Sequence, residues 1–174
     1  MTDMNRKIEF VVIDIDGTMT DGSIYYDEKG NEIKKFNTRD AAGFFALKKC
    51  GIKIIILTGR KSIAAERRMN ELKVDYLFQN VSDKKSFLTR FASEKGINLK
   101  HFGYIGDDLN DYAAMKNVGF VACPRDACKE VKAISDYVSN KKGGDGVVRD
   151  VAEHILKKVK LWDKIIEDLY FTGC

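Results

Sequence analysis

The chain alternates short apolar runs with segments in which apolar residues recur at helical spacing. The apolar runs have few polar interruptions, which predicts strands covered on both faces of a sheet. We expect strands at 8–15, 52–59, 74–79, 101–107 and 120–124, with an edge strand at 136–139. Between them the spacing predicts helices over 39–51, 62–73, 84–96, 109–119, 126–135 and 146–170, the last broken near Lys160.

This strand–helix alternation predicts an α/β fold with a doubly wound, Rossmann-like parallel sheet. The length of 174 residues suits one domain, so we expect a single domain over 1–174. "GSIYYDEKGNEIKKFN" predicts a β-hairpin flap at about 18–36 that turns at Lys29–Gly30–Asn31. No insertion is long enough for a separate cap domain. Helical spacing over 39–51 puts Ala42, Phe45, Ala46 and Lys49 on one side.

Charge and cysteine content exclude some classes of function. The formal net charge of +4 is mild and scattered, which allows an anionic small substrate and gives no nucleic-acid signal. Four cysteines without a CxxC pair indicate reduced thiols. The N-terminus has no apolar signal-peptide region, and no apolar run approaches the roughly 20 residues that span a bilayer. We therefore expect a cytoplasmic protein with no membrane partner.

Polar side chains follow the predicted strands, at the edge where parallel sheets bind ligands. In chain order these residues are Asp14 and Asp16, Thr58, Lys84, and Asp107, Asp108 and Asp111. Two acids at the end of a buried strand repel each other, and a divalent cation compensates that cost. Carboxylate oxygens favour Mg²⁺, and a carboxylate can also attack phosphorus. A hydroxyl and an ammonium suit the phosphoryl oxygens, so the set predicts phosphoryl transfer.

Each of these residues also has a structural interpretation. Asp107 or Asp108 could cap the helix that follows, Thr58 could be a turn residue, and Lys84 could be a solvated surface lysine. The pair in "DIDGT" has no such explanation, because it places two acids at the end of an apolar strand. The occurrence of all four elements in order favours a catalytic site.

The motifs "DIDGT", "LTGR", Lys84 and "GDDLND" resemble the four motifs of haloacid dehalogenase-type phosphatases. The resemblance implies that Asp14 is the nucleophile and Asp16 the general acid and base. It implies that Asp14, the main-chain carbonyl of Asp16 and Asp107 hold Mg²⁺, with Asp111 supporting them. It also implies that Thr58 binds phosphoryl oxygens and that Lys84 contacts both the nucleophile and the phosphate.

Two further segments, "DGSIYYDEKGNEIKKFNTRDAAG" and "KKGGDGVVRDVAEHIL", resemble the capless 3-deoxy-D-manno-octulosonate 8-phosphate phosphatases. The resemblance implies an Mg²⁺-dependent phosphatase of lipopolysaccharide biosynthesis. It implies a homotetramer whose hairpins form a central barrel and whose neighbouring subunits can cover the site. The substrate contacts it implies are Asp16, Asn37, Thr38, Arg39, Asp40, Ala41, Arg60, Arg68 and Lys84.

Three alternatives remain at this point. Close relatives act on 9-phosphates of nine-carbon keto acids such as sialic acids, and Ala41 and Asp145 depart from the eight-carbon pattern. The second alternative is a signalling receiver domain, which also has acids, a hydroxyl and a lysine together at the edge of a parallel sheet. Its phospho-acceptor, however, follows a middle strand and lacks a second Asp two residues on. A non-catalytic subunit is the third alternative, and the intact acids argue against it.

Overall fold

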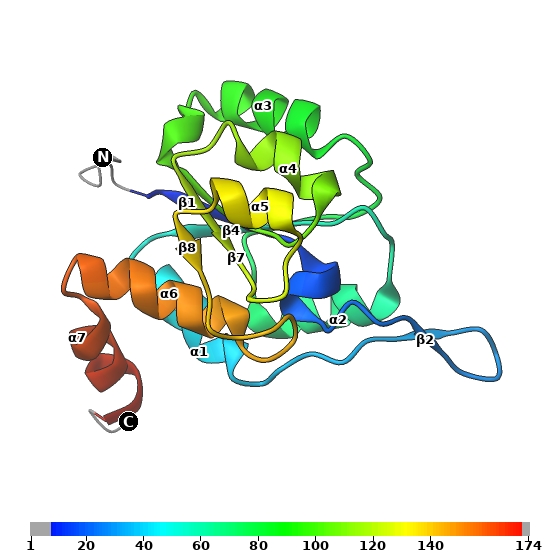
Figure 1. Cartoon of the computed structure of the whole chain (residues 1–174). Helices are drawn as coiled ribbons and strands as arrows, with labels where there is room; N and C mark the ends of the chain where they lie inside the picture. Colours follow the sequence, from blue (N-terminus) through cyan, green and yellow to red (C-terminus); the bar gives the residue numbers. More distant parts are fainter. Residues whose placement is uncertain (1–7, 172–174) are drawn as a thin grey trace.

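The computed structural model describes residues 8–171. Six strands form one sheet in the order β5-β4-β1-β6-β7-β8, and every neighbouring pair is parallel (Figure 1). The predicted doubly wound fold is therefore confirmed. The strands are β1 Phe10–Ile13, β4 Lys53–Leu57, β5 Tyr76–Phe78, β6 Phe102–Ile105, β7 Phe120–Cys123 and β8 Tyr137–Val138.

Helices cover both faces of this sheet (Figure 1). Alternate side chains of β1 enter two cores, because successive residues of a strand point to opposite faces: Val11 and Ile13 on one side, Phe10 and Val12 on the other. The first face carries α1 Asp40–Lys49, α2 Ile63–Leu72, α6 Val147–Lys158 and α7 Trp162–Ile166. The second carries α3 Lys84–Lys95, α4 Leu109–Met115 and α5 Lys129–Ile134.

Several predicted helix ends are confirmed. The Ser62 hydroxyl accepts a hydrogen bond from the Ala65 amide at 3.4 Å and caps α2. Gly96 ends α3 in the left-handed region, with φ of +67°. The C-terminal helical segment breaks at Lys160, where φ is +57°. Over the described residues, no helix combines the length and the apolar character that a membrane crossing requires.

The side of α1 that helical spacing predicts is only partly the packed side, because Ala46 is its one fully buried member. Phe45 and Lys49 are exposed, whereas Gly43, Phe44 and Leu47 are buried. The reason is tertiary: α1 packs against α6 so closely that a Cβ on Gly43 would lie 2.8 Å from the Arg149 Cα. The glycine therefore has to face α6, and this fixes the rotation of the helix.

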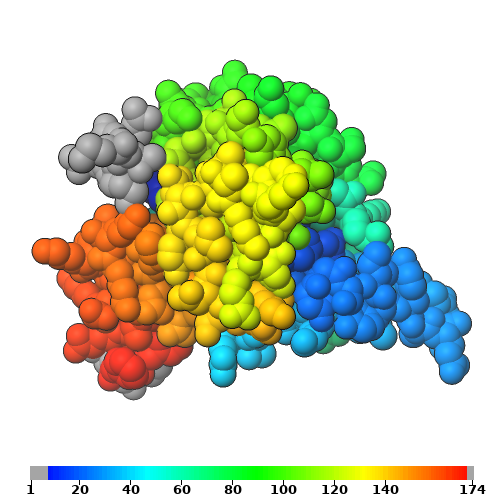
Figure 2. Space-filling model, in the orientation of Figure 1, coloured from blue at the N-terminus to red at the C-terminus, as the bar shows by residue number. Residues whose placement is uncertain are grey.

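The predicted hairpin flap is present, with strands β2 Tyr25–Tyr26 and β3 Glu32–Ile33. Its turn is held by Asp27, whose carboxylate accepts hydrogen bonds from the amides of Lys29 and Asn31. The flap projects from the body of the protein in the space-filling view (Figure 2). Four of its large apolar side chains are exposed: Ile24, Tyr25, Tyr26 and Ile33.

Candidate active site

The site lies at the carboxyl end of β1, between β4 and β6, where the strand order reverses direction. Asp14 is the first residue after β1, and its amide donates a hydrogen bond to the carbonyl of Ile105 on β6. Its side chain is only 2% exposed. The backbone pairing that ends the strand thus fixes this carboxylate inside the protein.

A wide turn at Ile15–Met19 follows Asp14. It brings the motif "DIDGT" into contact with the motif "GDDLND". Gly17 has φ of +87°, and a Cβ on it would lie 2.0 Å from the Asp107 carboxylate. Only glycine meets both conditions at this position. The Thr18 hydroxyl then donates a hydrogen bond to Asp107 Oδ1 at 3.1 Å. The Asp107 carboxylate is therefore held by the first motif, and the alternative that it caps the next helix does not hold, since the residue at the N-cap of α4 is Asp108.

Lys84 is the first residue of α3 and is buried, with 2% exposure. Its Nζ donates hydrogen bonds to Asp14 Oδ1 and to Asp111 Oδ1, both at 2.6 Å. Burial disfavours its charged form, but the charges of Asp14 and Asp111 outweigh burial and raise its pKa. The interpretation of Lys84 as a solvated surface lysine is therefore wrong.

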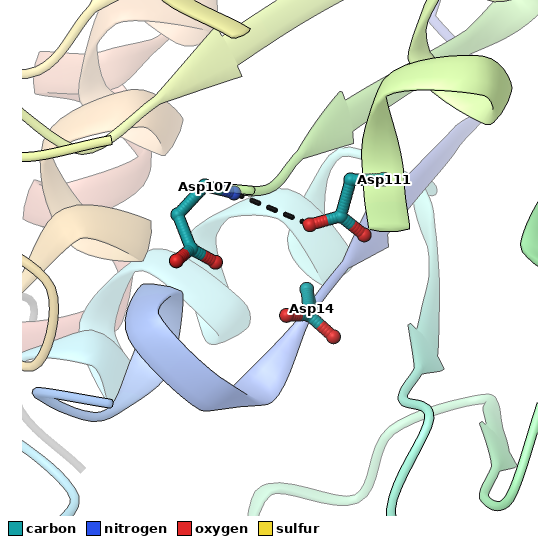
Figure 3. A group of neighbouring side chains, drawn as sticks. All are labelled: Asp14, Asp107 and Asp111. Carbon is teal, nitrogen blue, oxygen red and sulfur yellow. Dashed lines mark hydrogen bonds between the residues drawn. The ribbon is translucent and has the colours of Figure 1, made fainter. Parts of the chain in front are cut away.

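Three carboxylates converge beside this lysine from the end of β1, the loop after β6 and helix α4 (Figure 3). One oxygen each of Asp14, Asp107 and Asp111 lies within 4.8 Å of the others. Burial, followed by the charge of Asp111, raises the pKa of Asp14 and raises that of Asp107 to about 7. Such a crowd of hard oxygen ligands with raised pKa values fits a divalent cation such as Mg²⁺.

Asp111 links three other residues of the site through hydrogen bonds. Its Oδ1 accepts hydrogen bonds from Lys84 and from the Tyr104 hydroxyl at 2.8 Å, and its Oδ2 accepts one from the Asp107 amide at 3.2 Å. Sequence reasoning missed Tyr104. The available signal was a tyrosine inside an apolar strand, because a buried hydroxyl needs a polar partner.

Asp16 and Thr58 follow β1 and β4, two neighbouring strands of the sheet. The Asp16 carboxylate points to the flap, where the Lys34 ammonium donates a hydrogen bond to its Oδ1. Thr58 follows β4 and is 2% exposed, and its hydroxyl accepts a hydrogen bond from the Arg60 amide at 3.3 Å. The main-chain carbonyl of Asp16 belongs to the turn that Gly17 packs against Asp107.

The segment "FNTRD" reaches the site through the glycine loop at 143–146. The Asn37 side chain donates a hydrogen bond to the Gly144 carbonyl at 3.1 Å, and the Gly144 amide donates one to the Thr18 carbonyl at 3.1 Å. Thr38 and Arg39 are exposed beside this loop. "KKGGDG" therefore joins the predicted substrate-binding segment to the first motif.

Other predicted substrate contacts point elsewhere in this structure. Asp40 is 1% exposed, and its carboxylate accepts a hydrogen bond from the Arg149 amide at the start of α6. Burial raises its pKa to about 6. Ala41 lies half-buried beside it in α1. The Arg60 guanidinium bonds Glu32 at 2.6 Å, and that of Arg68 bonds Glu71 at 3.1 Å.

Comparison with known proteins agrees with this geometry. The model of the haloacid dehalogenase-like hydrolases matches residues 77–150. The chain is 37% identical to the 3-deoxy-D-manno-octulosonate 8-phosphate phosphatase of Yersinia pestis, over 86% of this chain and 80% of the relative.

Two solved structures match over nearly the whole chain. One is the 3-deoxy-D-manno-octulosonate 8-phosphate phosphatase of Moraxella catarrhalis in complex with magnesium, phosphate and KDO. It has a TM-score of 0.90 and 39% identity, with 95% of each chain covered. The other is a probable phosphatase of the yrbi family from Pseudomonas syringae, with a TM-score of 0.92, 32% identity, and 99% and 98% of the two chains covered. The chain therefore belongs to the haloacid dehalogenase-like hydrolases, in the family of the 3-deoxy-D-manno-octulosonate 8-phosphate phosphatases.

Proposed function

We propose that this chain is an Mg²⁺-dependent phosphatase that hydrolyses 3-deoxy-D-manno-octulosonate 8-phosphate to the free sugar acid and phosphate. The observation that carries the proposal is the buried Asp14–Lys84 pair at the end of β1, within ligand distance of Asp107. Membership of a hydrolase family excludes the receiver-module alternative. The named activity of the relatives supports the eight-carbon substrate.

The reaction begins with Asp14. Because Lys84 occupies its Oδ1, the other carboxylate oxygen is available to attack phosphorus. A bond forms between Asp14 and phosphorus as the bond to the sugar oxygen breaks, and Asp16 gives its proton to the leaving alcohol. Asp16 then takes a proton from the water that opens the aspartyl phosphate. Asp16, two residues after the nucleophile, thus allows the aspartyl phosphate to be hydrolysed. Without this acid the phosphorylated protein would persist.

Other residues stabilise the charge that develops on the phosphoryl group. We assign Thr58 and Lys84 to its oxygens, because both side chains are buried at the same edge of the sheet as Asp14. A bound Mg²⁺, held by Asp14, Asp107 and the carbonyl of Asp16, would supply positive charge to the phosphate oxygens. Asp111 fixes the positions of Lys84 and Asp107 by accepting a hydrogen bond from each.

The sugar acid carries a carboxylate far from its phosphate, and arginine binds carboxylates well. We assign Asn37, Thr38 and Arg39 to this recognition, because "FNTRD" adjoins the site through the glycine loop. Arg60 and Arg68 are assigned to it from the resemblance to the family. Asp40 and Ala41 are buried or half-buried. We therefore assign them the task of holding this segment against α6 rather than direct contact with the sugar.

We further propose that residues 1–174 act as one capless, cytoplasmic domain and that four chains assemble through their flaps. An open site of this kind gains from a neighbour that excludes water. Support comes from the exposed apolar residues on the flap, since contiguous exposed apolar side chains mark interaction surfaces.

Replacing Asp14 by Asn removes the nucleophile and keeps the shape of the side chain. Phosphate release should fall to less than about a hundredth of the wild-type rate, since catalysis by the covalent route is lost. Asp108→Asn is the matched control, because Asp108 is exposed and its side chain forms no capping hydrogen bond. Turnover of Asp14→Asn above that level, with the circular dichroism spectrum unchanged, would contradict the assignment.

Magnesium should stabilise the protein more at pH 8 than at pH 6. Asp107 has a folded-state pKa of about 7, above its unfolded value, so the metal-free fold loses stability as pH rises toward 7. Protons compete with the cation below that pH, and the cation relieves carboxylate repulsion above it. Differential scanning fluorimetry with MgCl₂ and with EDTA measures the effect. An equal shift in Tm at both pH values, or one retained in Asp107→Asn, would exclude this site.

The substrate itself is tested by free-phosphate release from two compounds. We expect kcat/KM for 3-deoxy-D-manno-octulosonate 8-phosphate to exceed that for a nine-carbon keto acid 9-phosphate by at least about tenfold, the effect of roughly 1.4 kcal/mol of differential binding. The opposite order would establish the nine-carbon alternative. Hydrolysis of p-nitrophenyl phosphate but of neither acid would leave a phosphatase with another substrate.

The assembly is tested by sedimentation velocity. The wild type should sediment with the mass of four chains, and the double variant Tyr26→Ser/Ile33→Ser should sediment as a smaller species, because it removes apolar area from the flap. Lys29→Ser, at the tip of the same flap, is the control. A wild-type mass of one chain at micromolar concentration would refute the tetramer.

A further inference from the structure

Lys34 has a buried side chain on a hairpin whose other residues are mostly exposed. Its side chain is 3% exposed, whereas that of the next residue, Lys35, is 66% exposed. Successive side chains of an extended segment point to opposite faces, so one lysine faces the body of the protein and the other faces solvent. Burying an ammonium group is costly unless it is paired, which makes the partners of Lys34 informative.

Those partners belong to the active site and to the flap. The Lys34 ammonium donates a hydrogen bond to Asp16 Oδ1 and lies 2.7 Å from Glu32 Oε1. The other oxygen of Glu32 accepts a hydrogen bond from Arg60 at 2.6 Å. Alternating charges therefore run from the loop after β4, across the flap, to the turn after β1. Lys34 is the member that touches Asp16.

The Lys34 contact also changes the net charge of the site. Four carboxylates lie at this edge of the sheet, namely those of Asp14, Asp16, Asp107 and Asp111. Within residues 8–171, Lys84 and Lys34 are the ammonium groups that touch members of this set. Without Lys34 the site would carry excess negative charge toward a phosphate dianion.

We propose that Lys34 is a positioning residue: it holds the Asp16 carboxylate on the leaving-group side of the site, where Asp16 transfers protons. The inference rests on the proposed function, because it concerns the acid and base of that reaction. The Asp16 side chain is 25% exposed although Ile15 and Thr18 beside it are buried, so its own packing does not fix it. A buried partner supplied by the flap does. Misplacement of a catalytic group by about 1 Å can cost about 100-fold in rate.

The experiment compares Lys34→Met, Lys34→Arg and Lys35→Met. We expect Lys34→Met to lower kcat by 10- to 100-fold and to change KM by less than about twofold, because the loss acts on proton transfer rather than on binding. Lys34→Arg keeps the charge and should recover most of the rate. Lys35→Met is the matched control, since Lys35 faces solvent on the same flap. Lys34→Gln, measured beside Lys34→Met with its Tm, keeps the test valid if the methionine variant unfolds.

A double-mutant comparison separates positioning from an independent role. If Lys34 acts through Asp16, Lys34→Met should slow an Asp16→Asn enzyme by less than about twofold. An equal loss in both backgrounds, a raised KM with unchanged kcat, or the same loss in Lys35→Met would each overturn the proposal. All variants are also measured with p-nitrophenyl phosphate. Failure of the sugar-acid substrate alone would then leave the Lys34 comparison intact.

Discussion

The structure depends on the repulsion among the carboxylates at the end of β1 and on the groups that offset it. Asp14, Asp107 and Asp111 lie within ligand distance of one another in a region from which water is largely excluded. Lys84 offsets part of their charge through two hydrogen bonds of 2.6 Å. Burial, followed by the charge of Asp111, still raises the pKa values of Asp14 and Asp107. A site built in this way has a strong preference for a divalent cation, and the same imbalance keeps one oxygen of the nucleophile reactive.

Close backbone approach is what makes this crowding possible. Gly17 admits the Asp107 carboxylate, and a Cβ on Gly106 would lie 2.6 Å from Asp111 Oδ2. The glycine loop approaches equally closely: a Cβ on Gly143 would lie 2.1 Å from the Gly17 carbonyl oxygen. Each of these positions requires glycine because a side chain would push an acid or the loop out of place. The sheet supplies the rigid base for these loops, since β1 is hydrogen-bonded on both sides.

The flap is a two-stranded sheet, separate from the main one, that contacts the active site. It reaches the site through polar contacts, Lys34 with Asp16 and Glu32 with Arg60, while its apolar residues face outward. The ion pairs, one of them made by the buried Lys34 ammonium, orient this short element, and its exposed apolar area is available to a neighbouring chain. Arg60 therefore has two proposed partners, the flap in this structure and the sugar acid during the reaction.

The sequence alone determined the fold class, the flap and the residues that meet at the sheet edge, because continuous apolar runs and acids after strands depend on local chemistry. Asp14, Asp107 and Lys84 meet as predicted. The roles of Arg39 and Arg68 in substrate binding remain predictions. Only the tertiary structure decided that Gly43 turns α1 toward α6, that Asp40 is buried beneath α6, that Tyr104 supports Asp111 and that Lys34 faces Asp16. These facts depend on how elements distant in sequence pack together, and neither periodicity nor motif spacing contains that information.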